Sequence, residues 1–362
     1  MQIGNSMQQS LDTAISRTNR SPALQPSCEH AFTSVIVCTL GSRPSLEQCL
    51  ASLVAQNCSR CEILVVLNGA HNDEFAQRLV SYPVRVLSET KRGISAARNR
   101  AVLSAEGSLL CFVDDDVIAD PDWLHQLISG FQDSLVACVT GRVRLEGSFL
   151  PNEVVKESYN SIRALSAWTL DNSEPNWFAK VLGPDVGFGC NLAFRKSFFE
   201  NCVRFPDALG AGAVVAATDE AFMFFEVMRH GLRINHCPSA TVTHVYDNDL
   251  KKQKKRTKEV CSAIVALHLK FLFEESGFRI KTLKVLIAAG KRRLGRVLRG
   301  HGVFRNRKDI LSFFERFGAE LRGIGLYCRY LLLRNTAGTM PRKDSYAIAQ
   351  PCEQPDCQPP DS

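Results

Sequence analysis

Three adjacent carboxylates, Asp114, Asp115 and Asp116, are the residues of this chain whose types and spacing most directly suggest chemistry. They follow the apolar run Leu109–Val113, which predicts a buried strand. Ligands of open α/β sheets bind beyond the carboxyl ends of the strands, so these carboxylates would lie where a ligand binds. Like charges at this spacing repel each other unless a cation or strong hydrogen-bond donors neutralise them.

The alternation of side chains at a strand end predicts that Asp114 and Asp116 point the same way, with Asp115 opposite. Two convergent carboxylates suit a hard divalent cation, Mg²⁺ or Mn²⁺, that keeps open positions for phosphate oxygens. The alternative is an acidic turn that caps the helix predicted over Asp122–Phe131. The triplet alone leaves both interpretations open.

Strands and helices that alternate along the first half of the chain must position these acids. Phe32–Thr39, Glu62–Leu67 and Val84–Leu87 predict strands, because each is rich in apolar and β-branched residues. A helix rich in small residues opens at Arg92–Ala101 and leads to the acidic strand. This order predicts an α/β protein with a Rossmann-like, mostly parallel sheet flanked by helices.

The second half of the chain contributes glycines and a second pair of acids. Gly187 and Gly189 precede a short predicted strand, where a backbone can approach a ligand closely. Leu209–Ala217 is rich in glycine and alanine and predicts a mobile loop. Asp219 and Glu220 then begin an apolar helix.

Composition is ordinary for a soluble globular protein, with 45% hydrophobic and 22% charged residues. The 14 cysteines are scattered through apolar segments without zinc-finger spacing, which indicates small buried residues in a reducing cytoplasm. No uninterrupted apolar run of the sequence approaches the length that spans a bilayer. We therefore expect a cytoplasmic protein.

Charge is unevenly distributed along the chain. Leu250–Asn335 contains 22 Lys and Arg and 6 Asp and Glu, a net charge of +16, while the whole chain carries +7, so the remainder carries −9. We predict four regions from these contrasts: a disordered tail over 1–31, an α/β domain over 32–249, a basic amphipathic helical region over 250–335 and a disordered tail over 336–362.

The basic region predicts peripheral contact with the inner face of the cytoplasmic membrane. It opens with the basic run Lys251–Arg256, and arginines interrupt the apolar pattern further on, so a helix there would lie on the membrane instead of crossing it. Apolar residues that recur at helical spacing are Ile310, Phe313, Phe314, Phe317, Leu321, Ile324, Cys328 and Leu331. The alternative is that this stripe packs onto the α/β domain and leaves the arginines solvated.

In their order, the motifs between Thr33 and Tyr246 resemble the inverting nucleotide-sugar glycosyltransferases of family 2, which have the GT-A fold. The segments that carry the resemblance are Val35–Thr39, Glu62–Val66, Arg92–Asn99, Phe112–Asp116, Gly189–Arg195, Thr218–Glu220, and Pro238–Ala240 followed by His244. The resemblance implies transfer of a sugar from a nucleotide-diphospho-sugar to a lipid-linked or saccharide acceptor, with inversion, in cell-surface polysaccharide or glycolipid synthesis. The Q-x-x-R-W motif of processive synthases is absent, which favours transfer of a single sugar.

The same resemblance implies roles for the acids and for one histidine. Asp116 would bind Mg²⁺ or Mn²⁺ with His244 nearby, and Asp114 would lie nearer the nucleotide. Asp219 matches the catalytic base, although Thr218 stands where the family usually has glutamate, so the choice between Asp219 and Glu220 stays open. Without the resemblance, these last two acids favour an interaction with a helix dipole.

The donor-binding residues that the resemblance implies come from several segments. They are Cys38, Thr39, Asn68, Arg98, Asp114 and Asp115. Most relatives carry aspartate where this chain has Leu67, so base recognition would fall to Asn68, which is otherwise an ordinary turn residue. Arg98 could equally lie on a helix surface, and His244 could be a structural strand-end histidine.

Two other functions compete with sugar transfer. A sugar-1-phosphate nucleotidyltransferase uses a similar sheet and acidic site, but it needs a glycine-rich basic loop after the first strand, where this chain has the glycine-poor Leu40–Pro44. A non-catalytic protein that binds nucleic acid or membranes would rest on the basic region alone. We expect no nucleic-acid partner.

Overall fold

The computed structural model describes residues 31–41, 45–69, 73–146, 162–183, 186–200, 202–245, 249–298 and 307–336. The predicted terminal tails fall almost wholly outside these residues.

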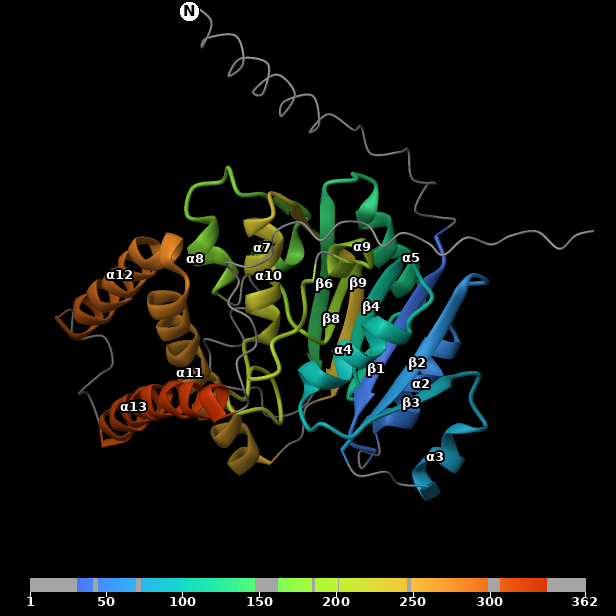
Figure 1. The fold of residues 1–362 in the computed structure, drawn as a ribbon, viewed down its shortest axis with the longest axis horizontal. Coiled ribbons are helices and arrows are strands. Elements are labelled where there is room, and N and C mark those ends of the chain that lie inside the picture. The colour runs from blue at the N-terminus through green and yellow to red at the C-terminus, as the bar shows by residue number, and fades with distance from the viewer. Residues whose placement is uncertain are drawn as a thin grey trace, which may run out of the picture.

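A nine-stranded mixed sheet forms the centre of the described chain (Figure 1). Its strands are β1 (Thr33–Thr39), β2 (Cys61–Asn68), β3 (Arg85–Glu89), β4 (Leu109–Asp114), β5 (Val117–Ala119), β6 (Val136–Glu146), β7 (Trp168–Leu170), β8 (Asn191–Arg195) and β9 (Arg233–Val245). They pair in the order β3-β2-β1-β4-β8-β6-β9-β5, with β7 also on β9. Pairing is parallel from β3 to β4, whereas β8 enters antiparallel between β4 and β6. The predicted α/β class is confirmed.

Helices cover both faces of the sheet. They are α2 (Ser45–Val54), α3 (Asp73–Leu79), α4 (Ile94–Ser104), α5 (Trp123–Ile128), α7 (Ile162–Leu165), α8 (Trp177–Val181), α9 (Ser197–Glu200), α10 (Asp219–Arg229), α11 (Leu250–Glu274), α12 (Arg279–Leu298) and α13 (Arg307–Thr336). Helices α2 and α5 share a core with one face, and α4, α10 and α11 share a core with the other.

Strand β1 shows why two cores form. Its apolar residues alternate in direction, so Ile36 joins the core under α4 and α10 while Val35 and Val37 join the core under α2. All seven residues of the strand are buried, as expected for a central parallel strand covered on both faces.

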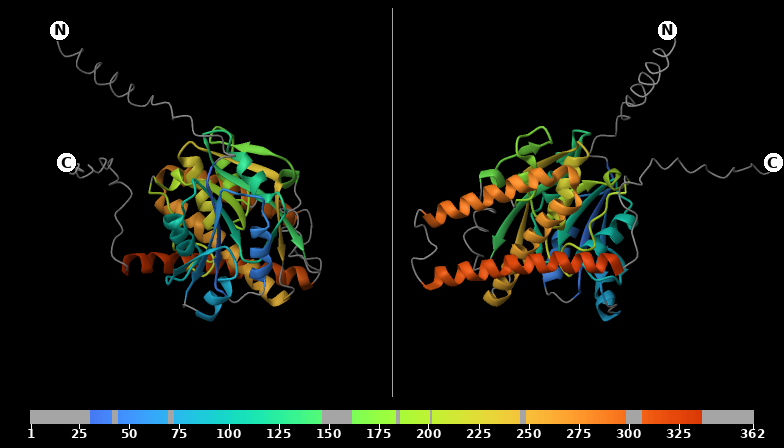
Figure 2. Two further views of the ribbon diagram at one scale, coloured as in Figure 1. Left: turned by 90° about the vertical axis from the view of Figure 1, so that its right-hand side faces the viewer. Right: turned by 60° about the vertical axis from the view of Figure 1, so that its left-hand side comes forward.

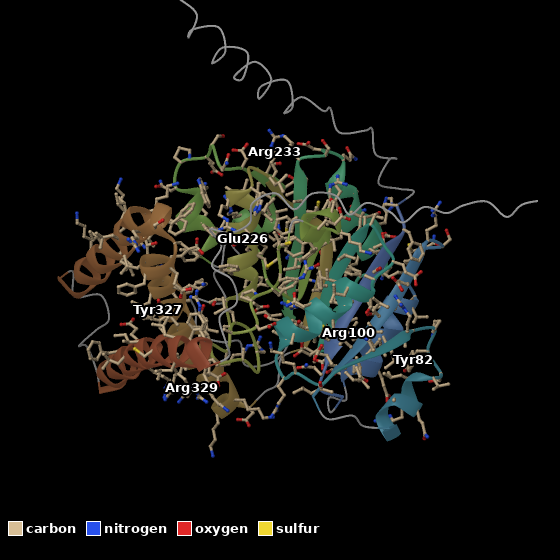
Figure 3. The ribbon with its side chains drawn as sticks, in the orientation of Figure 1. Tyr82, Arg100, Glu226, Arg233, Tyr327 and Arg329 are labelled. Atoms are coloured by element: carbon tan, nitrogen blue, oxygen red, sulfur yellow. The ribbon has the colours of Figure 1, made fainter. Side chains whose placement is uncertain are left out.

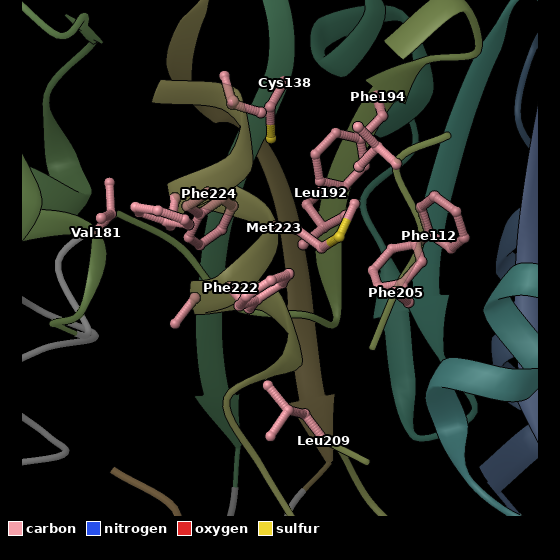
Figure 4. Packing of buried hydrophobic residues seen from close by; sticks show 14 of the residues in the cluster. Phe112, Cys138, Val181, Leu192, Phe194, Phe205, Leu209, Phe222, Met223 and Phe224 are labelled. Atoms are coloured by element: carbon pink, nitrogen blue, oxygen red, sulfur yellow. The ribbon is translucent and has the colours of Figure 1, made fainter. Parts of the chain in front are cut away.

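The core under α10 is rich in aromatic rings and continues into the basic region. Figure 4 shows Phe112 and Phe205 together, with ring centroids 5.3 Å apart. The ring centroids of Phe225 of α10 and Phe271 of α11 are 4.5 Å apart, so α11 is anchored in the α/β body. Helices α12 and α13 extend from that end of the molecule (Figure 2). Among the described helices, none combines the length and the apolar character needed to cross a membrane.

Candidate active site

The carboxyl ends of the parallel strands meet at one edge of the sheet, and most of the predicted site residues meet there too. Cys38 of β1 is in register with Asp114 of β4, and Thr39 is in register with Leu67 of β2. Parallel pairing therefore places residues distant in sequence at one ligand-binding edge.

Asp114, Asp116 and His244 form a cluster that could hold a metal ion, with ligand atoms all within 4.8 Å of one another. The pairing of β5 with β9 builds it, because Val117 is in register with His244 and the His244 ring thereby lies beside Asp116. The His244 Nε2 to Asp116 Oδ1 distance is 3.4 Å. The Asp114 side chain is 27% exposed, so the cluster opens to solvent on that side.

Asp115 points away from this cluster, as the alternation of the strand end predicts. Its Oδ2 accepts a hydrogen bond from Thr39 Oγ1 at 2.6 Å, and the same hydroxyl accepts one from the Gly41 N–H at 3.0 Å. Asp115 and Thr39 are both buried. In the described structure this predicted donor-binding pair therefore joins β1 to the acidic turn.

Arg98 connects the acidic strand to the second pair of acids. From helix α4 its Nη1 donates to Asp219 Oδ2 at 2.6 Å, and its Nη2 donates to Asp114 Oδ1 at 3.3 Å. The same Nη2 also donates to the Gly189 carbonyl at 2.9 Å. The guanidinium thus fixes two carboxylates and one backbone oxygen from three different segments.

Burial makes this connection costly to break. The Arg98 side chain is only 5% exposed, and its guanidinium lies 5.5 Å from the ring centroid of Phe205. Burial alone would lower the pKa of Arg98, but Asp219 and Asp114 outweigh that effect and raise it above its ordinary value. The charge therefore persists inside the protein.

Asp219 and Glu220 begin helix α10 and differ in environment. Asp219 is buried against Arg98. Glu220 retains some accessible surface, but desolvation of its carboxyl group, followed by the charge of Asp219, raises its pKa to about 8. A carboxyl with that pKa is mostly protonated at neutral pH.

The loop from Leu209 to Ala217, predicted to be mobile, packs over Asp219. Leu209 and Val215 are buried, and the Ile94 N–H donates to the Ala211 carbonyl at 2.9 Å. Gly210 has φ +96°, and a Cβ there would lie 2.9 Å from Asp219 Oδ1. Close approach to Asp219 is therefore one physical reason for glycine at this position.

Two other predicted donor-binding residues have structural partners. Asn68 donates to the Lys91 carbonyl at 2.7 Å and accepts from the Gly93 N–H at 2.9 Å, so its amide holds the turn before α4. Burial raises the pKa of the Cys38 thiol to about 12, so that thiol stays neutral at the strand end.

Two residues that were not among the predicted site residues help to build the site. The Gly189 carbonyl binds Arg98, and a Cβ on Gly189 would lie 3.1 Å from Arg98 Nη2. Asn191 is fully buried; it accepts from the Trp123 indole at 2.9 Å and donates to the Ala240 carbonyl at 2.9 Å. In the sequence, the paired glycines before β8 pointed to Gly189. Nothing local pointed to Asn191, because its role depends on tertiary contacts.

The fold belongs to the GT-A class of glycosyltransferases. A mannosyltransferase from Pyrobaculum calidifontis, solved in complex with GDP-Man and Mn²⁺, superposes with a TM-score of 0.55 over 87% of this chain and 93% of its own, at 15% identity. That likeness establishes the architecture only.

Residues 34–203 match the model of glycosyl transferase family 2, and this chain therefore carries a glycosyltransferase domain of that family, as its motifs predicted. Asp219 and His244 lie beyond the matched segment. Among the three predicted functions, the match favours sugar transfer.

Curated relatives share the domain at modest identity. A glucosyl-dolichyl phosphate glucuronosyltransferase of Haloferax volcanii is 26% identical over 174 residues, which is 46% of this chain and 53% of the relative. An O-antigen chain rhamnosyltransferase of Salmonella anatum is 24% identical over 199 residues, 53% of this chain and 59% of the relative. The matched part of the chain spans little more than half the length of these relatives.

Proposed function

We propose that the protein transfers one sugar from a nucleotide-diphospho-sugar to an acceptor hydroxyl in a single displacement with inversion. The observation that carries the proposal is the Arg98 contact that joins Asp219 to Asp114 of the acid–histidine cluster. The acceptor oxygen would bond to the anomeric carbon as the bond to the diphosphate oxygen breaks. The hydroxyl proton would pass to a carboxylate, and the nucleoside diphosphate would depart.

The cluster of Asp114, Asp116 and His244 fits a divalent cation, Mg²⁺ or Mn²⁺. Two carboxylates and one imidazole from two segments converge, one side is open for phosphate oxygens, and the structurally similar mannosyltransferase was solved with Mn²⁺. When bound, such an ion stabilises the negative charge that develops on the departing diphosphate.

We propose Asp219 as the base. The Glu220 carboxyl, with its pKa raised to about 8, holds a proton at neutral pH and cannot accept another. Arg98 would orient the Asp219 carboxylate through the hydrogen bond to Oδ2. Cys38, Thr39, Asn68 and Asp115 would shape the donor site through the strand ends and turns that they hold.

The acceptor would be a lipid-linked or saccharide hydroxyl, and the product a cell-surface polysaccharide or glycolipid. Relatives named for a dolichyl phosphate and for an O-antigen chain support this acceptor class. We place the enzyme in the cytoplasm, at the inner face of the membrane.

Two substitutions test the assignment in a donor-hydrolysis and transfer assay with a panel of nucleotide sugars. Asp219→Asn should lower turnover by about 10²–10⁴-fold at saturating donor and acceptor, because the proton acceptor is lost. Asp116→Asn should abolish the response of the rate to added Mn²⁺.

Asp122→Asn is the matched control, since Asp122 is exposed close to the same turn and its side chain caps no helix N–H. It should retain activity and metal response. Near-normal turnover of Asp219→Asn would refute the base assignment, and an unchanged Mn²⁺ response of Asp116→Asn would refute the metal assignment.

A further inference from the structure

Helix α13 presents an apolar stripe to solvent. Phe317, Leu321, Ile324, Cys328 and Leu332 recur at helical spacing, and the four large side chains are 48%, 53%, 47% and 68% exposed, with Cys328 exposed as well. We call these five residues the outer face of α13. An isolated exposed leucine is ordinary, but a continuous stripe of this kind indicates a contact surface.

The opposite side of α13 is held firmly against α11. Ala319 and Tyr327 are buried there, and a Cβ on Gly323 would lie 2.5 Å from the Ser262 carbonyl. Ser262 Oγ donates to the Ala319 carbonyl at 2.7 Å. The interpretation that the predicted stripe packs onto the body is therefore wrong for its members on the outer face, because small residues and Tyr327 make that contact instead.

Two arginines border one side of the outer face. Arg322 and Arg329 are exposed and lie on the helix beside the stripe, and Figure 3 shows Arg329 on the opposite side of α13 from Tyr327. A helix with an apolar stripe bordered by arginines is the form that lies in the plane of a membrane interface, with its cations near the headgroups.

Helix α12 repeats the pattern at the same end of the molecule (Figures 1 and 2). Ile280, Leu283 and Ile287 share one face and are 71%, 50% and 49% exposed. Lys284 and Lys291, also exposed, border them. Two amphipathic helices of the same character therefore leave the catalytic body together.

We propose that the outer face of α13, assisted by α12, docks the enzyme on an anionic lipid surface. Charge favours lipid over a second copy of the chain, because a symmetric dimer through this face would bring two basic surfaces together, whereas anionic headgroups complement them. This proposal rests on the proposed function, which includes a lipid-linked acceptor, and adds which surface of the enzyme contacts the membrane. Vesicle binding tests it without any transfer reaction.

The experiment measures co-sedimentation of the full chain with vesicles of phosphatidylcholine alone and with vesicles that also contain phosphatidylglycerol. Leu321→Gln/Ile324→Gln should weaken binding to the anionic vesicles about tenfold or more, because apolar burial is lost. Arg322→Gln/Arg329→Gln should weaken it about fivefold per charge and reduce its salt dependence.

The control is Val80→Gln/Leu103→Gln, which removes two apolar side chains, 81% and 66% exposed, from the catalytic body. It should bind as the parent does, and unchanged urea midpoints should show that all variants are folded. Absence of binding to anionic vesicles, or equal binding by Leu321→Gln/Ile324→Gln and the control, would overturn the proposal. So would a dimer in solution that Leu321→Gln/Ile324→Gln abolishes while no vesicle binding is found.

Discussion

The catalytic edge of the sheet and the C-terminal helices use charge in opposite ways. At the sheet edge, Arg98 and Asp219 have side chains only 5% and 6% exposed, and each is the partner of the other. On α13, Arg322 and Arg329 are exposed and border apolar side chains that are exposed too. The sheet edge holds a buried charge pair, whereas these two arginines of α13 are exposed to solvent.

Buried charge pairs and exposed charges suit different functions. A buried charge pair tolerates little rearrangement, since either partner alone would remain desolvated, so it fixes the positions of the groups around it. An exposed charge is solvated whether or not it meets a partner, and it contributes little to folding. Buried charge pairs therefore suit a site whose groups must be held in place, and exposed charges suit a surface that contacts a partner.

The largest effect that this comparison predicts is on folding stability at the sheet edge. Arg98→Met should lower the free energy of unfolding by about 3–5 kcal/mol, because Asp219 and Asp114 would lose their shared cation in a buried place. Urea denaturation followed by circular dichroism would measure the loss.

Arg100→Met, on the same helix but exposed, is the control and should change stability by less than about 0.5 kcal/mol. Equal effects of the two substitutions would mean that the Arg98 contacts stabilise the fold no more than surface pairs do.

Much of the catalytic edge could be predicted because it follows from local pattern. The apolar runs of β1 and β4, their parallel pairing and the opposite directions of Asp114 and Asp115 all result from strand periodicity. The relation of Arg98 to Asp219 could not be predicted in the same way, because 121 residues separate them and only the packing of α4 against the loop before α10 brings them together.

Helix α13 shows more clearly what a sequence pattern cannot predict. Its apolar spacing predicted an amphipathic helix, but spacing cannot say which face meets the protein. The face with Ala319 and Gly323 packs because small residues let the backbone of α13 approach α11 closely, while Phe317 and Leu321 remain outside. Shape complementarity decides this, and it is a property of the partner helix as much as of α13.

A second prediction concerns the pH dependence of stability at the sheet edge. Glu220 has an ordinary pKa of 4.5 and a folded-state pKa of about 8, so between these values the folded chain holds a proton that the unfolded chain has released. Stability should therefore fall as pH rises from about 5 to 8, and each pKa unit of the shift corresponds to about 1.4 kcal/mol. Urea midpoints across this range would show whether Glu220→Gln removes that part of the decline.

Glu200→Gln, at an exposed position, should leave the pH dependence unchanged. If Glu220→Gln declined with the same slope as the parent, the Glu220 carboxyl would not be desolvated. Glu220 would then be ionised at neutral pH and able to act as the base.

The smallest effect belongs to the surface. Arg322→Gln/Arg329→Gln should change the free energy of unfolding in urea by less than about 0.5 kcal/mol, since both side chains are exposed on α13. Tyr327→Ala, on the packed side of the same helix, should cost about 3 kcal/mol or more, because it leaves a cavity beside Phe273. A loss of several kcal/mol in the arginine variant would mean that this side of α13 is buried within the protein. The two regions would then use charge in the same way, and the outer face would not be available to a lipid surface.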